Sequence, residues 1–383
     1  MPSITVVVPT YNRAALLDVT LRSILAQTVS VGEIIVVDDG STDETPSVCA
    51  RQPKNVRYLR QENTGLPAFG RNRAIAEATG EWIAFCDSDD RWHPRKLEIQ
   101  LAAIEATGAQ WAVSGFGLID PEGAPVPVEG LGFGREFPVF KQLKRTPADH
   151  FGRWLTKLVV NTPTGPVDVF AGDAFGMLFE GNVCLTSSAM VKRDLIARAG
   201  GYDPAFMAED TEFFHRLSAH APVAIVMSAL LDYRIGHASM MSVRDVAPFI
   251  QSALKSIDKA ARLRPQLTPV ERSAHRRGRA RLRLGLAYQR LSSLDRTGAR
   301  QAVVDGWRQG ELLSARSLAI LVASLLPSPA LEALHSAKRG LRAAVVSRLG
   351  SRRDPGTRGR RIRGVENQGE TSDPPVDDDG VRG

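Results

Sequence analysis

The sequence has few cysteines, few aromatic residues and no long apolar run. Cys49, Cys86 and Cys184 are its three cysteines, and no C-x-x-C spacing joins them, so neither a disulfide framework nor a zinc knuckle is indicated. No stretch reaches the roughly 18 apolar residues of a membrane-spanning helix. The short apolar run at the N-terminus has no basic flank before it, so no signal peptide is expected. These absences predict a cytoplasmic protein.

The charges are distributed unevenly along the 383 residues. Residues 1–250 carry 23 Lys+Arg against 29 Asp+Glu, residues 251–364 carry 25 against 7, and the remaining tail is acidic. The basic region is either a solvated helical face or a surface that attracts anionic membranes or polyanionic substrates. Aromatic residues are sparse among its arginines, which argues against nucleic acid as a partner.

Strand-like and helix-like segments alternate over the first hundred residues. The predicted strands are Ile4–Val8, Glu33–Val37, Val56–Arg60 and Glu81–Phe85. The predicted helices are Arg13–Gln27, a segment from about Asp43, Leu66–Thr79 and a segment after Pro94. This alternation predicts an α/β fold in which helices flank a mainly parallel sheet.

A polar segment follows each predicted strand. These segments are Pro9-Thr10-Tyr11-Asn12, Asp38–Asp43, Asn63-Thr64-Gly65 and Asp87-Ser88-Asp89-Asp90. In an open parallel sheet, ligands bind outside the carboxyl ends of the strands, so the four segments should gather at one edge. We expect them to hold a nucleotide, with Tyr11 beside the base and Asp39 accepting from base or ribose groups. Arg71, at the start of the following helix, would meet a base carbonyl or a phosphate.

The acids at Asp87, Asp89 and Asp90 form the strongest local signal. Carboxylates this close repel one another unless a positive charge lies among them. A divalent cation that also binds two phosphates would supply that charge, because Mg²⁺ takes one or two carboxylates plus substrate oxygens. The alternative is an acidic loop that caps the helix after Pro94.

A second acidic pair, Glu209-Asp210, precedes apolar residues with helical spacing. Both acids then lie at a helix N-terminus, where the helix dipole favours negative charge. Asp210 is either a helix cap or a general base, because taking a proton from a hydroxyl needs a fixed carboxylate within hydrogen-bond reach.

Taken in order, these motifs closely resemble the family 2 glycosyltransferases. The matching segments are Y-N, V-D-D-G-S-T-D, N-T-G-L-P-A-F-G-R-N, D-S-D-D-R-W-H-P-R-K-L-E and G-G-Y-D-P with E-D-T-E-F-F-H-R-L. The resemblance covers about residues 3–242. It implies the GT-A fold, a nucleotide-diphosphate sugar donor, a saccharide or lipid-linked acceptor and, in general, inversion at the anomeric carbon. A role in bacterial cell-surface polysaccharide or glycoconjugate synthesis follows.

The resemblance also implies roles for individual residues. Pro9, Tyr11 and Asp39 would contact the nucleotide, with Arg71 nearby. Further substrate-binding residues would be Thr10, Asn12, Ser88 and Glu209. Asp87 and Asp89 would form the D-x-D pair that binds Mn²⁺ or Mg²⁺, with Asp89 the direct ligand. Asp210 would be the base. His237 would lie near the metal or the diphosphate, although one extra residue separates it from Arg234 compared with the usual family pattern.

Two other functions remain open from the sequence. A sugar nucleotidyltransferase on a related fold would carry a glycine-rich loop near the first strand, and Pro9-Thr10-Tyr11-Asn12 is not such a loop. A non-catalytic protein that binds nucleotide sugars could keep the fold without the acids, but Asp39, Asp89 and Asp210 are all present.

We expect three parts along the chain. Residues 1–245 would form the glycosyltransferase domain, in which the Pro- and Gly-rich segment 120–180 supplies acceptor-side loops. Residues 246–349 would form a helical accessory module. The predicted helices of this module are Pro248–Arg264, Pro269–Leu294, Thr297–Leu313, Ala315–Leu326 and Ala330–Leu349. Residues 350–383 would be a disordered tail.

Overall fold

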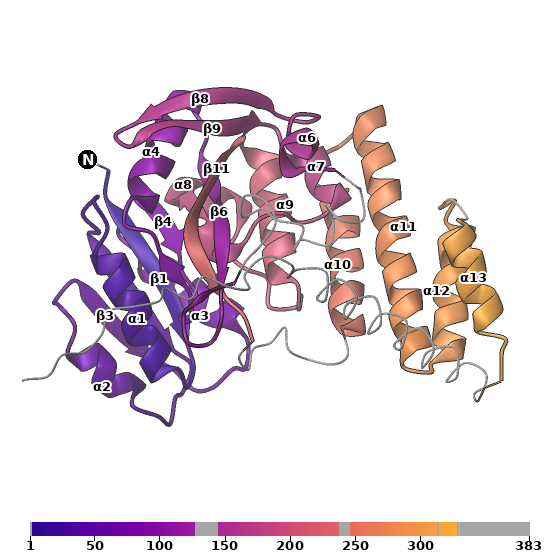
Figure 1. Cartoon of the computed structure of the whole chain (residues 1–383), viewed down its shortest axis with the longest axis horizontal. Helices are drawn as coiled ribbons and strands as arrows, with labels where there is room; N and C mark the ends of the chain where they lie inside the picture. Colours follow the sequence, from indigo (N-terminus) through magenta and orange to yellow (C-terminus); the bar gives the residue numbers. More distant parts are fainter. Residues whose placement is uncertain (1, 127–144, 237–245, 312–313, 328, 330–383) are drawn as a thin grey trace, which may run out of the picture. The chain divides into compact units, whose positions relative to one another are not determined.

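The computed structural model describes residues 2–126, 145–236, 246–311, 314–327 and 329 (Figure 1). Within these residues, eleven strands form one sheet, in which β3-β2-β1-β4-β10-β6-β11-β9-β8 is the main order, β5 pairs with β11 and β7 pairs with β6. The strands are β1 (Ile4–Thr10), β2 (Glu33–Asp38), β3 (Val56–Arg60), β4 (Trp82–Phe85), β5 (Arg91–Trp92), β6 (Trp111–Ile119), β7 (Pro125–Val126), β8 (Thr156–Thr162), β9 (Gly165–Gly172), β10 (Met190–Lys192) and β11 (Val223–Arg234).

The sheet is mixed. β1 pairs in parallel with both β2 and β4, and β2 pairs in parallel with β3. The three-residue strand β10 runs antiparallel between β4 and β6, so β6 keeps the direction of β4, and β11 pairs in parallel with β6. Most strands therefore run in one direction, as the sequence predicts, and their carboxyl ends share an edge.

Helices cover both faces of the sheet. They are α1 (Ala14–Leu25), α2 (Thr45–Ala50), α3 (Pro67–Glu77), α4 (Lys96–Thr107), α6 (Pro147–Phe151), α7 (Phe175–Glu180), the short 3₁₀ helix η1 (Thr186–Ser188), α8 (Arg193–Ala199), α9 (Glu209–His220), α10 (Ala247–Ala260), α11 (Pro269–Ser292), α12 (Arg296–Arg308) and α13 (Ala315–Ala323). In β1, Val7 packs on the face covered by α3, α7, α8 and α9, whereas Val6 and Val8 pack on the face covered by α1, α2 and α4. Burial on both faces explains why β1 is an unbroken apolar run.

Helices α10 to α13 follow the sheet and belong to the same compact unit, residues 1–326. Ile257 of α10 and Ala274 of α11 pack in one apolar cluster with Phe175 and Phe179 of α7. α11 begins with a capping box between Thr268 and Glu271. Four of the predicted helices are therefore present within the described residues. The predicted helix Ala330–Leu349 and the tail lie outside them, and the boundary at residue 245 stays a prediction.

The segment expected to form acceptor-side loops is more regular than predicted. Its described part, from residue 145 onward, contains α6, the antiparallel hairpin β8–β9 and α7. The glycines that indicated loops lie at the ends of these elements instead. Gly165 follows the hairpin turn and Gly172 ends β9, and both have a positive φ. None of the helices in the described ranges is long and apolar enough to cross a membrane.

Candidate functional site

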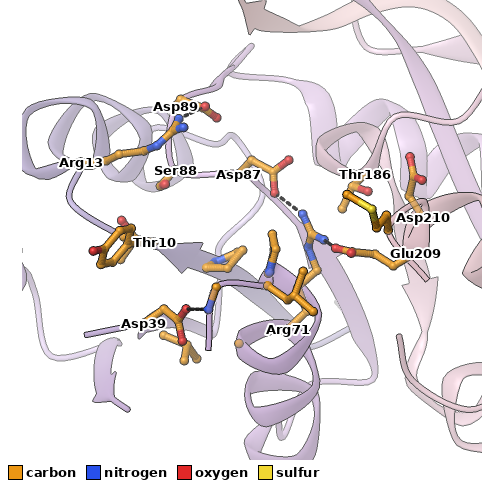
Figure 2. Close-up of a pocket in the computed structure, with 18 of the residues that line it drawn as sticks. Thr10, Arg13, Asp39, Arg71, Asp87, Ser88, Asp89, Thr186, Glu209 and Asp210 are labelled. Atoms are coloured by element: carbon orange, nitrogen blue, oxygen red, sulfur yellow. Dashed lines mark hydrogen bonds and ion pairs between the residues drawn. The ribbon is translucent and has the colours of Figure 1, made fainter. Parts of the chain in front are cut away.

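A cavity of about 440 Å³ lies where β1, β2 and β4 end and where α3 and α9 begin (Figure 2). This is the strand-end edge that the sequence predicts. Ten of the predicted site residues line it: Pro9, Thr10, Tyr11, Asp39, Arg71, Asp87, Ser88, Asp89, Glu209 and Asp210. A cavity of this size suits a small-molecule ligand.

Two predicted site residues are not among these ten. Asn12 is not in the cavity wall. It has a φ of 50°, its backbone N–H donates to Ser41 Oγ at 2.8 Å, and its Oδ1 accepts from the Thr42 N–H at 2.7 Å. Asn12 therefore ties the loop after β1 to the loop after β2. His237 lies outside the described residues.

The Asp39 carboxylate organises the loop that carries Thr64. Its oxygens accept hydrogen bonds from the Thr64 N–H, the Thr64 hydroxyl, the Gly65 N–H at 3.0 Å and the Gln61 amide at 2.8 Å. Gly65 has a φ of 73°, a conformation that favours glycine. One side chain thus fixes two neighbouring strand-end loops at the cavity wall.

Arg71 bridges two acids that are distant in the sequence. Its guanidinium donates to Asp87 Oδ1 at 2.7 Å and to Glu209 Oε1 at 2.6 Å (Figure 2). The side chain is 6% exposed and lies over the Tyr202 ring. Because Arg71 is occupied by two carboxylates in this structure, its expected contact with a base or phosphate stays a prediction. Its observed role is to join β4 to the start of α9.

Asp89 and Asp90 lie in different surroundings although they are adjacent. Asp89 lines the cavity and forms an ion pair with Arg13, which lies just before α1. Asp90 is buried, and its Oδ1 accepts from the Arg234 N–H at 3.2 Å. Burial, together with the neighbouring Asp89 and Asp87, raises the pKa of Asp90 well above its usual range. Asp90 is therefore structural, and Asp87 and Asp89 are the two acids of this segment that face the cavity.

Asp210 lies in the first turn of α9, on the far side of Glu209 from Arg71 (Figure 2). Its Oδ1 accepts from the Thr211 N–H at 2.6 Å, and its Oδ2 accepts from the Asn182 amide at 3.2 Å. Burial raises the pKa of Asp210, while the Thr211 hydrogen bond and the Arg71 charge oppose the shift. Burial also raises the pKa of Glu209 to about 7, against the nearby Arg71. Both acids are thus easier to protonate than exposed carboxylates.

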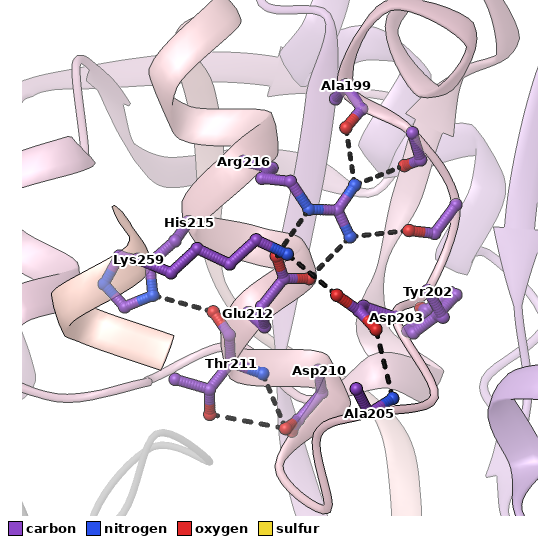
Figure 3. Close-up of polar contacts among 12 residues, drawn as sticks. Ala199, Tyr202, Asp203, Ala205, Asp210, Thr211, Glu212, His215, Arg216 and Lys259 are labelled. Carbon is purple, nitrogen blue, oxygen red and sulfur yellow. Dashed lines mark hydrogen bonds and ion pairs between the residues drawn. The ribbon is translucent and has the colours of Figure 1, made fainter. Parts of the chain in front are cut away.

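A polar network holds α9 in place (Figure 3). Arg216 pairs with Glu212 at 2.6 Å and donates to the carbonyl oxygens of Ala199, Gly200 and Gly201. Lys259 of α10 bonds both Glu212 and Asp203 at 2.8 Å. The G-G-Y-D-P motif therefore has a structural role, because its residues bond Arg216 of α9 and Lys259 of α10. It anchors the helix whose first turn presents Asp210.

Several cavity residues were not predicted from the sequence. The main ones are Arg13, Leu66, Leu185, Thr186, Met207, Tyr233 and Phe249. Arg13 directly follows the Y-N motif, and this position in the sequence was the one feature that could have indicated a place in the cavity wall. Leu66 is an apolar residue inside the N-T-G-L-P-A-F-G-R-N motif. The others are uncharged residues outside the polar motifs, and they reach the cavity through tertiary packing.

The side chains at the cavity have the chemistry to bind a divalent cation, but they do not supply a complete set of ligands. Asp87 and Asp89 offer the carboxylate oxygens that Mg²⁺ or Mn²⁺ binds. Among the described residues, no group of three or more His, Cys, Asp or Glu side chains could hold a metal. A cation here would therefore depend on oxygens from a bound diphosphate.

Residues 5–157 match the family model for glycosyl transferase family 2. The chain carries a family 2 glycosyltransferase domain. It is 37% identical over 140 residues, 35% of its length, to an uncharacterized glycosyltransferase from Rickettsia felis, 23% of which is covered. It is 37% identical over 124 residues to the succinoglycan biosynthesis protein ExoO of Rhizobium meliloti, covering 32% of the chain and 36% of ExoO. The chain spans about half or less of the length of the curated relatives it matches.

Solved structures of glycosyltransferases share the fold. The mannosyltransferase PcManGT from Pyrobaculum calidifontis, solved in complex with GDP-Man and Mn²⁺, gives a TM-score of 0.53 at 21% identity over 91% of this chain and 87% of its own. TarS from S. aureus gives 0.51 at 17% identity over 88% of this chain and 53% of its own. The family and the GT-A fold predicted from the sequence motifs are confirmed.

Proposed function

We propose that this chain transfers a sugar from a nucleotide-diphosphate donor to an acceptor hydroxyl with inversion at the anomeric carbon. The observation that carries the proposal is the meeting of Asp39, Asp89 and Asp210 in the wall of one cavity, although up to 171 positions separate them in the sequence. The name of the relative ExoO supports a role in bacterial cell-surface polysaccharide or glycoconjugate synthesis.

The donor nucleotide would lie along the ends of β1 and β2. Tyr11 is 47% exposed at the cavity, so its ring is available to a base, and Pro9 lines the wall beside it. Asp39 holds the Thr64–Gly65 loop and would accept hydrogen bonds from base or ribose groups. Ser88, between the two cavity-facing acids, would contact the diphosphate.

Asp89 and Asp87 would hold Mn²⁺ or Mg²⁺ together with the donor phosphates. The structural neighbour PcManGT was solved in complex with GDP-Man and Mn²⁺, which supports this choice of donor class and cofactor. The bound cation would neutralise the negative charge of the departing diphosphate. Arg13 and Arg71, which pair with the two acids in this structure, place further positive charge at the same point.

Asp210 would act as the general base. Its carboxylate would accept the proton of the acceptor hydroxyl while that oxygen forms a bond to the anomeric carbon. The bond from this carbon to the diphosphate oxygen breaks on the opposite face, and the nucleoside diphosphate leaves with the bonding electrons. Thr211 and Asn182 hold the carboxylate in one orientation, which such a base requires.

The acceptor would be a saccharide, free or lipid-linked. Leu318 and Val322 of α13, and Leu325 just after its end, follow an i, i+4, i+7 spacing and are 52%, 56% and 66% exposed. Arg296 donates to the Leu326 carbonyl at 2.7 Å, so positive charge lies at the end of this segment. Exposed apolar residues beside basic ones support peripheral association with an anionic membrane, on its cytoplasmic side.

A donor screen tests the proposal. Purified protein is incubated with UDP-, GDP- and dTDP-sugars, with Mn²⁺ or with a chelator, and release of nucleoside diphosphate is measured. We expect one donor to be hydrolysed or transferred in the presence of metal. Asp89→Asn should weaken donor binding with metal and leave metal-free binding unchanged.

Other outcomes of the screen would point elsewhere. Release of pyrophosphate from a nucleoside triphosphate would support a nucleotidyltransferase instead. Donor binding without turnover under any condition would support a binding protein. If a product forms with the anomeric configuration of the donor, as read by proton NMR, the single-displacement mechanism fails.

A further inference from the structure

A cluster of arginines surrounds the buried Glu180 at the end of α7. Glu180 is 1% exposed, and Arg277 of α11 donates to its Oε1 from Nη2 at 2.5 Å and from Nε at 3.1 Å. Arg145, just before α6, donates to Oε2 at 3.4 Å. These two contacts join three segments that are far apart in the sequence around one carboxylate.

The cluster holds more positive charge than Glu180 can neutralise. Arg281 lies one turn after Arg277 on α11, and burial lowers the pKa of its guanidinium to about 10, with Glu180 opposing the shift. Among the described residues, Arg281 makes no hydrogen bond or ion pair. His150, which is fully buried, has its pKa lowered to about 4 by burial, so it is neutral at pH 7. The cluster therefore carries surplus positive charge.

The structure brings α11 unusually close to α7 at this point. A Cβ on Gly278 would lie 2.0 Å from the carbonyl oxygen of Phe179, so only glycine permits this approach. Gly278 lies between Arg277 and Arg281 in the sequence. The close packing sets the Arg277 guanidinium against Glu180 at the end of α7, and Arg281 lies one helical turn further along α11. A need to anchor α11 would account for the Arg277–Glu180 pair but not for the half-buried Arg281.

A short stretch of chain joins the arginine cluster to Asp210, the proposed base. Glu180 is two residues before Asn182, which spans at most about 7 Å of chain, and the Asn182 amide donates to Asp210 at 3.2 Å. The same segment continues to Leu185 and Thr186 in the cavity wall. An acceptor whose hydroxyl meets Asp210 would therefore extend toward the arginines.

We propose that Arg145, Arg277 and Arg281 bind a phosphate group of the acceptor. Guanidinium groups are suited to phosphate, because their N–H donors match its oxygens in pairs. A partly buried cation without a counter-charge is costly, and a phosphate would supply that charge. The inference rests on the proposed function, because it names the chemical class of the acceptor.

Calorimetric titration with inorganic pyrophosphate tests this site. The titration is run with a chelator, so that metal-dependent binding at the Asp87–Asp89 acids does not contribute. We expect wild-type protein to bind pyrophosphate and Arg281→Gln to bind it at least tenfold more weakly. Arg276→Gln is the matched control, since Arg276 is an exposed arginine on the same helix and should leave binding unchanged. Arg281→Lys should keep part of the affinity, because it keeps the charge without the paired donors.

Two results would overturn the inference. One is equal pyrophosphate affinity in wild type, Arg281→Gln and Arg276→Gln, and the other is no binding by the wild type at millimolar concentration. Vesicles that contain phosphatidic acid distinguish the source: Arg281-dependent sedimentation with them indicates a lipid phosphate, and binding of pyrophosphate alone indicates a soluble one. If no donor is hydrolysed by the wild type, the proposed function fails while the titration still reports on this site.

Discussion

The two sides of the cavity hold their acids in different ways. On the side proposed to bind the donor, Asp87 and Asp89 each pair with a guanidinium, from Arg71 and Arg13. On the side proposed to bind the acceptor, and within the described residues, Asp210 accepts hydrogen bonds from uncharged groups alone, those of Thr211 and Asn182. The same residue type therefore lies in two electrostatic environments within one cavity.

This difference separates two chemical roles. A carboxylate that binds a metal ion must be in its charged form, which a neighbouring guanidinium favours. A general base must take up a proton, and burial raises the pKa of Asp210, although the Thr211 hydrogen bond and the Arg71 charge oppose this shift. In the proposed mechanism, Asp87 and Asp89 would hold a cation on the donor side, and Asp210 would take up a proton on the acceptor side.

The largest effect is expected for Asp210→Asn. The amide keeps the shape of the side chain but cannot accept a proton, so kcat should fall by about 10²–10⁴-fold. Donor affinity, measured by calorimetry with metal, should stay within about twofold, because the donor side is untouched. Asp194→Asn is the matched control, since Asp194 is likewise an acid in the first turn of a helix, α8, but is exposed and outside the cavity wall. Full turnover in Asp210→Asn would remove the base assignment.

A large effect on stability is expected for Arg71→Met. The change leaves Asp87 and Glu209 without their shared cation in a buried setting, which typically costs about 3–5 kcal/mol. Denaturant unfolding should show this loss. Arg73→Met, on the same helix, removes one exposed hydrogen bond to the Arg60 carbonyl and should cost about 1 kcal/mol or less. Equal losses in both variants would mean that the bridge contributes little.

A smaller effect is expected for Asp39→Asn. The amide replaces one acceptor oxygen by a donor, which would face the N–H groups of Thr64 and Gly65 and loosen their loop. Nucleotide affinity should fall about tenfold, or about 1.4 kcal/mol. Asp43→Asn is a control in the neighbouring loop, because Asp43 accepts from Ala14 and Thr45 outside the cavity wall. An unchanged affinity in Asp39→Asn would show that the loop does not hold the nucleotide.

Much of the donor side could be predicted from the sequence. Short apolar strands followed by polar motifs indicate where chains turn at one sheet edge, and the rule for parallel sheets then gathers Tyr11, Asp39 and Asp89. The ion pairs between the cavity acids and arginines could not be predicted. Arg71 and Glu209 are 138 positions apart, and their contact depends on how α3 and α9 pack.

The acceptor side was harder to predict for physical reasons. The strand β10 has only three residues, too few to show an alternation of apolar and polar side chains. It nevertheless runs antiparallel between β4 and β6. β8 is an edge strand with largely exposed side chains, and the neighbouring β9 is mostly half-buried, so the hairpin sequence lacks the apolar run of a central strand. Asn182 donates a hydrogen bond to Asp210, but it belongs to no sequence motif that would have indicated this contact.

The smallest effect is expected for Asn182→Ala, and it concerns the pH profile. The Asn182 amide donates to the Asp210 carboxylate and favours its charged form, so its loss should raise the pKa of Asp210 further. Because the base acts when deprotonated, the acidic limb of kcat should move to higher pH, with the rate unchanged at alkaline pH. Asn182→Asp should move the limb further in the same direction, since it adds a like charge and can still accept from the Cys184 N–H. An acidic limb that stays in place in both variants would assign it to a group other than Asp210.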